Sequence, residues 1–160
     1  MHPTKHDLSE PARGAAAELL NVNLADAIDL AMQAKQAHWN VKGPEFYALH
    51  KLFDDVAEGI QSGVDDLAER IAQLGGVAEG TIGAVKGRSR LPAYPLTLTD
   101  GRDHLHALRD SLASFARTVR ASIDAATEVR DADTADLFTE VSRAVDKYLW
   151  LVEAHLQAAK

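Results

Sequence analysis

The chain has 160 residues, a formal net charge of -7 and no cysteine. This length fits one domain that can bury a core without staples, and the absence of thiols excludes disulfides, zinc ribbons, iron–sulfur clusters and thiol catalysis. The negative charge attracts cations but repels nucleic acid and anionic lipid, so any polyanion partner needs a local basic patch. No apolar run approaches the ~20 residues of a membrane span, and the first residues lack a signal core. We therefore expect a cytoplasmic protein with no membrane association.

The first helix is predicted from Ala15 to Trp39, and residues 1–14 before it are expected to form a flexible tail. The folded domain is then predicted over residues 15–160. Apolar residues recur at helical spacing along the predicted helix, at Leu20, Leu24, Ile28 and Ala31. Lys35 and His38 continue the same face, so the last turn of this helix carries a histidine.

A second helix is predicted to begin after Gly43-Pro44 and to end at about Leu74, because Gly75-Gly76 stops it. Its apolar seam is regular and consists of Phe46, Leu49, Phe53, Val56, Ile60, Leu67, Ile71 and Leu74. Such a seam has to pack against other helices.

The second half of the chain predicts a long connection followed by two more helices. Residues 77–99 are rich in Gly, Pro, Ser and Thr and leave room for one short helix. A third helix is predicted from Asp100, which can cap it, to about Ala126, and a fourth opens at Asp133-Thr134. Their seams are Leu105, Leu108, Leu112, Phe115, Val119 and Ile123, and Phe138, Val141, Val145, Tyr148 and Val152. This pattern predicts an all-α, ferritin-like four-helix bundle with a long connection between its second and third helices.

A stripe of ligand-type side chains runs beside the apolar seam of the second helix. His50, Asp54, Asp65 and Glu69 fall within roughly 100° of one another around the helix axis. His50 and Asp54 are four residues apart, as are Asp65 and Glu69, so each pair can share a metal ion. Imidazole together with carboxylate suits ferrous iron. A solvated polar face is the alternative, and it would account for either pair by itself.

The two pairs are too far apart to hold one ion within one chain. His50 and Glu69 are separated by ~28 Å along a helix at 1.5 Å per residue. If two such helices pack antiparallel about a two-fold axis, the first pair of one chain lies beside the second pair of the other, and two identical sites form. We predict the crossing point near Gly59 and Ile60, where Gly59 and Gly63 suggest a close approach. The smallest active unit is then a dimer.

The segment from Lys35 to Gly43, KQAHWNVKG, followed by Phe46, His50, Asp54 and the DDLAER run from Asp65 to Arg70, resembles the Dps family, the DNA-binding proteins from starved cells. The resemblance covers the chain from roughly Ala15 to its end, including residues 132–136 and 146–150. It implies a ferroxidase centre shared between two-fold-related subunits. One chain supplies His38, His50 and Asp54, and the other supplies Asp65 and Glu69.

The resemblance also implies what the assembly does. Dps-like proteins are hollow dodecamers, built from two-fold dimers, that oxidise Fe(II), preferably with hydrogen peroxide rather than oxygen, store ferric mineral and protect against oxidative damage. A bacterial-type cytoplasmic protein is implied, with nucleoid association left open. No Glu in the chain has His three positions later, which argues against the intrachain di-iron site of larger ferritins. Iron is the expected metal, and zinc is a possible competitor.

Further residues have two interpretations each. Asp131, Asp133 and Asp136 suit a helix N-terminus, and by resemblance they are candidates to line acidic pores that draw ferrous iron inward. Trp39 could intercept radicals formed near the metal or pack in the dimer interface, and we favour packing. Lys35 could pair with a ligand carboxylate as structural support. The three remaining C-terminal-half histidines, His104, His106 and His155, are interpreted as ordinary surface or core residues.

The tail does not have the basic character with which many Dps proteins bind DNA. Lys5 and Arg13 are balanced by Asp7 and Glu10, and Lys160 stands alone at the other end. We expect weak or absent DNA binding at neutral pH, with a gain in acid as the tail histidines become charged. The alternative function is a nucleoid-binding structural protein whose metal site only stabilises the dimer.

Overall fold

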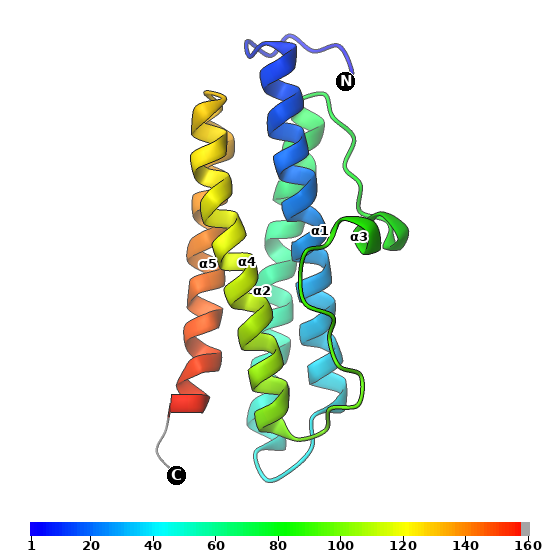
Figure 1. Cartoon of the computed structure of the whole chain (residues 1–160), viewed down its shortest axis with the longest axis vertical. Helices are drawn as coiled ribbons and strands as arrows, with labels where there is room; N and C mark the ends of the chain where they lie inside the picture. The colour runs from blue at the N-terminus through cyan, green and yellow to red at the C-terminus, as the bar shows by residue number, and fades with distance from the viewer. Residues whose placement is uncertain (158–160) are drawn as a thin grey trace.

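The computed structural model describes residues 1–157, and within them four long helices form an antiparallel bundle (Figure 1). The helices are α1 (Glu10–Asn40), α2 (Phe46–Gln73), the short α3 (Ile82–Arg88), α4 (Gly101–Glu128) and α5 (Ala132–Gln157). α1 packs against α2, and α4 against α5. Because α2 and α4 run in the same direction, the connection between them has to span the length of the bundle. The predicted all-α bundle, its long connection and the short helix within it are confirmed.

The bundle begins earlier than the sequence pattern indicated. Ser9 accepts a hydrogen bond from the backbone N–H of Ala12 and caps α1, so the helix starts at Glu10. Arg13 is only 7% exposed, and its Nη1 donates to the carbonyl of Leu74 at 2.7 Å. Residues 10–14, predicted as part of the tail, therefore belong to the folded bundle. The overlooked signal was a serine cap followed by a proline in the first helical turn.

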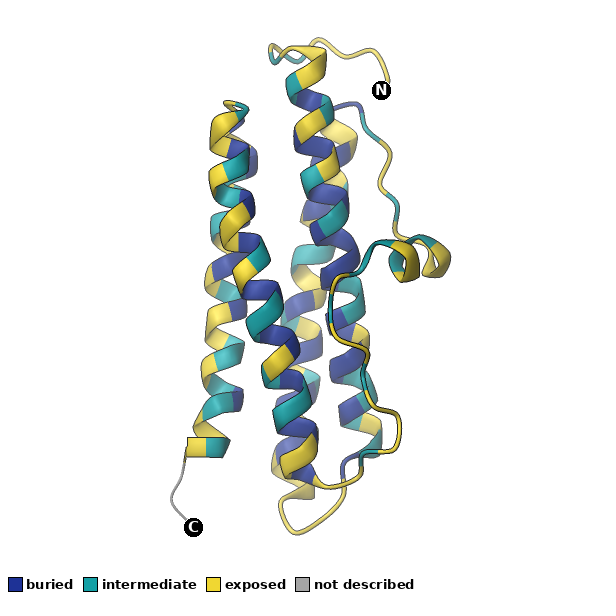
Figure 2. Ribbon diagram, in the orientation of Figure 1, coloured by how far each residue is buried: buried dark blue, intermediate teal, exposed yellow. Residues whose placement is uncertain are grey.

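The buried faces of the four helices meet along the centre of the bundle, as the dark stripes in Figure 2 show. The predicted seams supply this core, with one clear exception at the start of α2. Phe46 is 44% exposed and does not join the core. At the other end of α2, Gly75 adopts a φ of +83°, which terminates the helix where the Gly-Gly pair predicted.

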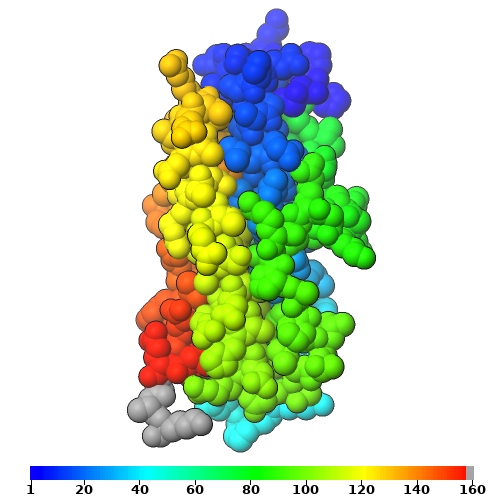
Figure 3. Space-filling view, viewed as in Figure 1, coloured from blue at the N-terminus to red at the C-terminus, as the bar shows by residue number. Residues whose placement is uncertain are grey.

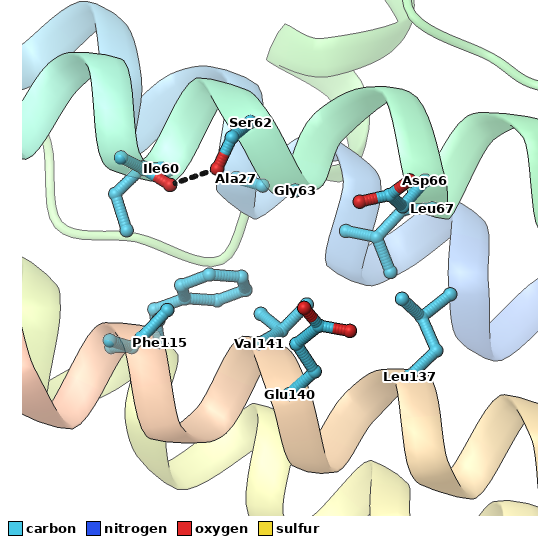
Figure 4. A pocket seen from close by; sticks show the side chains of 13 residues that line it. Ala27, Ile60, Ser62, Gly63, Asp66, Leu67, Phe115, Leu137, Glu140 and Val141 are labelled. Carbon is cyan, nitrogen blue, oxygen red and sulfur yellow. Dashed lines mark hydrogen bonds between the residues drawn. The ribbon is translucent and has the colours of Figure 1, made fainter.

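Gly59 allows a close approach inside one chain. A Cβ atom at this position would overlap the hydroxyl end of the Tyr148 ring, so the glycine lets this ring of α5 lie directly against α2. At Gly63 the corresponding atom would meet Val141 at an ordinary 3.6 Å. Figure 4 shows the small apolar pocket that these glycines leave between α2 and α5. The close approach at Gly59 is thus explained by Tyr148, and the position of a dimer crossing stays a prediction.

The connection between α2 and α4 is held against α1 by polar contacts. Asp26 of α1 is fully buried, and the guanidinium of Arg90 donates to its carboxylate at 2.6 and 3.0 Å. Arg88 pairs with Glu18 and Glu79, both at 2.7 Å. In the space-filling view, the segment around α3 stands out from the side of the bundle (Figure 3). α3 itself contributes no buried residue.

Within residues 1–157, no helix is both long and apolar enough to cross a membrane. Lys160, considered above for DNA binding, lies outside the described residues.

Candidate metal centre

His38 and His50 meet across the interface between α1 and α2. Their rings stack with centroids 3.7 Å apart and planes inclined by 20°. Nδ1 of His38 lies 2.7 Å from the carbonyl oxygen of His50, and Nδ1 of His50 lies 2.9 Å from the carbonyl oxygen of His38. A carbonyl can only accept, so each Nδ1 carries the hydrogen and donates it. In the neutral form of each ring, Nε2 then keeps a lone pair for a metal ion, as in the ligand tautomers of metalloproteins.

Asp54 places a negative charge beside this pair. Its carboxylate accepts a hydrogen bond from Nζ of Lys35, and one of its oxygens lies 3.9 Å from Nδ1 of His38. The pKa of Asp54 is lowered, chiefly by the hydrogen bond from Lys35, although partial burial acts in the opposite direction. The carboxylate is therefore ionised and able to bind a cation. The predicted pairing of Lys35 with a ligand carboxylate is confirmed.

The ring of Phe46 lies next to His50, with centroids 5.1 Å apart and planes inclined by 31°. This contact explains why a predicted core residue is 44% exposed: it packs on an imidazole instead of entering the core. Phe46, His50 and His38 form a row of three rings that restricts the rotation of both imidazoles. The position of Phe46, four residues before His50 on a helix, was the sequence signal for this role.

Asp65 and Glu69 lie far along α2 from the histidines. Both are exposed, and in the described part of the chain neither carboxylate has a hydrogen-bond or ion-pair partner. No three His, Asp or Glu side chains of residues 1–157 converge closely enough to hold a metal ion. One chain therefore brings His38, His50 and Asp54 near one another without forming a complete metal site, and it leaves Asp65 and Glu69 out of reach.

The three acidic residues near the start of α5 differ in their surroundings. Asp131 is 2% exposed and accepts hydrogen bonds from Arg70 at 2.7 Å and from the Thr134 hydroxyl at 2.6 Å. Burial acts to raise the pKa of Asp131, but the bonds from Thr134 and Arg70 outweigh it and lower the pKa. Its carboxylate caps α5 and neutralises a buried arginine, so we remove it from the candidate pore. Asp133 and Asp136 are exposed and remain candidates.

Trp39 is 61% exposed beside His38. A large aromatic surface next to an incomplete half-site is consistent with packing against a partner chain. Neither packing nor radical interception is tested by one chain, so both stay predictions.

A four-helix bundle with a long crossover and imidazole and carboxylate ligands defines the ferritin-like class of proteins. Residues 17–160 match the ferritin family, described as a ferritin-like domain. The DNA protection during starvation protein of Agrobacterium fabrum is 45% identical over 156 residues, which span 98% of this chain and 96% of that protein. The chain belongs to the Dps family of ferritin-like proteins.

Solved structures agree with this assignment. Mycobacterium smegmatis Dps in a tetragonal crystal form has a TM-score of 0.94 and 31% identity, covering 99% of this chain and 96% of its own. The Dps protein of Vibrio cholerae O1, described as a member of a broad superfamily of ferritin-like diiron-carboxylate proteins, has a TM-score of 0.91 and 26% identity, with 98% of both chains covered.

Proposed function

We propose that this protein is a ferroxidase and iron store. It oxidises ferrous iron, its substrate, at sites formed between two chains, and keeps the ferric product inside a hollow oligomer, which limits oxidative damage. The observation that supports this most directly is the reciprocal bonding of His38 and His50. Each imidazole is held by the backbone of the other residue, which leaves both Nε2 atoms free, and a carboxylate oxygen of the ionised Asp54 lies 3.9 Å from Nδ1 of His38.

The second half of the site comes from a partner chain. The distance between His50 and Glu69, ~28 Å along a helix, can be closed only by an antiparallel α2. An open groove between α1 and α2 runs from Lys35 to Asp65 on the required face, and Met32, 52% exposed, lines it. A second α2 in this groove would carry its own Asp65 and Glu69 to His38 and His50, and a dodecamer would contain six such dimers.

The donor set suits oxidation of iron. Two neutral imidazoles bind Fe(II), and three carboxylates favour the more highly charged Fe(III) over Fe(II) electrostatically. Hydrogen peroxide is the proposed oxidant because it accepts two electrons and two ferrous ions supply them, so that water forms instead of hydroxyl radical. Zinc, which binds the same ligands without redox chemistry, would compete with iron and inhibit the reaction.

The name of the Agrobacterium relative, DNA protection during starvation protein, favours one alternative, a nucleoid-associated protein whose metal only stabilises the dimer. The first residues of the chain do not favour direct DNA binding. Their charge is balanced, and the backbone N–H of His2 donates to the carbonyl of Gly75 at 2.6 Å, which holds the chain start against the end of α2. Removal of ferrous iron and peroxide would protect DNA without contact.

Iron oxidation tests the proposal. Ferrous iron is added to metal-free protein with hydrogen peroxide or with air, and absorbance and protein-bound iron are followed. We expect the wild-type protein to oxidise iron quickly and keep it soluble, and we expect zinc to inhibit the oxidation. Asp65→Asn should lose both the fast oxidation and the soluble iron. The neighbouring Asp66→Asn makes the same chemical change on another face of α2 and serves as the matched control with wild-type activity. Oxidation no faster than in buffer would overturn the ferroxidase function and leave the structural alternative.

A further inference from the structure

A tyrosine and a histidine form a largely buried pair that packs against Phe53 of α2. Tyr94 lies on the connection before α4, and its hydroxyl is 2.6 Å from Nδ1 of His104 in the second turn of α4. The two rings are nearly parallel, with planes 18° apart. His104 is 1% exposed, and Tyr94 is half-buried. The iron chemistry proposed above does not use either residue.

The surroundings of His104 determine which ring nitrogen carries the hydrogen. Burial lowers the pKa of His104, while the backbone carbonyls of Leu98 and Asn40 favour a hydrogen on the ring. Nε2 has no hydrogen-bond partner among the described residues, and the carbonyls of Leu98 and Asn40 are the backbone acceptors that act on the ring. We therefore assign the hydrogen to Nε2, so that Nδ1 accepts from the phenol of Tyr94. Burial also raises the pKa of Tyr94 well above its ordinary value, so the phenol keeps its proton at rest.

One buried ring of α2 links this pair to the helix segment that carries His50 and Asp54. The ring of Phe53 lies 6.1 Å from that of His104, centroid to centroid, and is fully buried. Phe53 directly precedes Asp54 in α2 and follows His50 by one helical turn. The route from Asp54 to Tyr94 thus runs along the backbone to Phe53 and then through the rings of Phe53 and His104.

We propose that Tyr94 is an electron donor to the metal centre, and that its phenol proton passes to Nδ1 of His104 as the electron leaves. A phenol that loses an electron becomes strongly acidic, and a base must already stand within hydrogen-bond reach because an unpaired charge is costly in a buried site. The Tyr94–His104 distance of 2.6 Å meets that condition. The carbonyls of Leu98 and Asn40 and the nearby Asp100 and Asp103 stabilise the imidazolium that forms.

This inference rests on the proposed ferroxidase function and supplies what the site lacks when only one ferrous ion is bound. Hydrogen peroxide then receives one electron from Fe(II) and one from Tyr94. The reaction consumes Fe(II), peroxide, the phenol, the neutral imidazole and two protons from solvent. It produces Fe(III), two waters, the phenoxyl radical and the imidazolium. A later ferrous ion returns the electron to Tyr94, and His104 returns the proton. Peroxide is thereby fully reduced without release of hydroxyl radical.

The other two tyrosines do not have this arrangement. Tyr47 is 71% exposed, and Tyr148 has the ammonium of Lys147 5.5 Å from its ring centroid, which disfavours loss of an electron. In the described residues neither has an imidazole partner. The double variant Tyr47→Phe/Tyr148→Phe therefore keeps Tyr94 as the only tyrosine of the chain.

The test uses electron paramagnetic resonance in two arms. In the first, metal-free protein is oxidised by flash photolysis of a ruthenium polypyridyl complex. In the second, protein with one ferrous ion per site is mixed with hydrogen peroxide and frozen. Ring-deuterated tyrosine distinguishes a tyrosyl radical from a tryptophan radical. We expect a tyrosyl signal in both arms in wild type and in the double variant, with loss to background in Tyr94→Phe. His104→Gln, which keeps an acceptor but not a base, should lose most of the signal.

The two arms separate this inference from the proposed function. A signal that survives in Tyr94→Phe, or no tyrosyl signal in the double variant after flash oxidation, overturns the role of Tyr94 even if the protein oxidises iron. A Tyr94 radical in the flash arm but not with iron and peroxide, in protein that oxidises iron, overturns electron donation to the metal centre. Failure of all iron oxidation with a normal flash result overturns the ferroxidase function and, with it, electron donation to iron.

Discussion

Two inactive variants of this protein should restore each other when their chains are mixed. In His50→Ala the histidine half of both sites in a dimer is damaged, and in Glu69→Ala the carboxylate half is damaged, so each homodimer is inactive. In a mixed dimer, one site combines both damaged halves. The other combines the intact histidines of one chain with the intact carboxylates of its partner. The ~28 Å between the two positions on α2 makes this exchange obligatory.

The expected rate of iron oxidation follows from how the two kinds of chain pair into dimers. Random mixing makes half of the dimers mixed, and each has one intact site of two, so the initial rate should be about one quarter of wild type. The chains are co-expressed or refolded together, and oxidation of ferrous iron with peroxide is followed by absorbance. His38→Ala mixed with His50→Ala is the matched control, because both residues lie in the same half-site and no mixed dimer contains an intact site. Equal recovery in both mixtures, or none in the first, would refute the shared-site geometry.

Three further results are expected. Asp131→Ala removes one partner of a buried ion pair and a helix cap, and should lower the free energy of unfolding by about 3 kcal/mol in urea titrations. The control Asp133→Ala, at an exposed position, should change the free energy of unfolding by less than about 0.5 kcal/mol. Equal effects of the two variants would contradict the role assigned to Asp131. Lys35→Met removes the hydrogen bond that lowers the pKa of Asp54. The stability that this bond contributes is fully present above the ordinary carboxyl pKa of 3.8 and is lost as pH falls through the lowered pKa of Asp54. Wild type should therefore exceed the variant in urea midpoint at neutral pH, and the two should converge in acid; a constant difference would count against this linkage. Phe46→Ala should weaken cobalt binding about 10-fold by freeing the stacked imidazole, with an unchanged unfolding midpoint, and Phe46→Tyr should restore binding.

The sequence alone determined the helices and the face on which the ligands lie. The seams of α2 and α4 repeat at a period close to that of the helix, and burial of these apolar residues is a local consequence of that period. The same period placed His50, Asp54, Asp65 and Glu69 on one stripe, and the helical rise by itself showed that one chain cannot close the site. Dps resemblance then assigned His38 to the same centre.

Only the tertiary structure decided which distant residues meet. The reciprocal bonds of His38 and His50, the contact of Gly59 with Tyr148, and the pairing of Arg70 with Asp131 all join segments remote in sequence. Periodicity shows which face of a helix a side chain occupies. It does not show which residue of another helix lies next to that side chain, or whether that neighbour donates a hydrogen bond, accepts one or keeps water out. For that reason Phe46 was predicted in the core and Asp131 in a pore, and the Tyr94–His104 pair became visible only once the crossover was folded against α4.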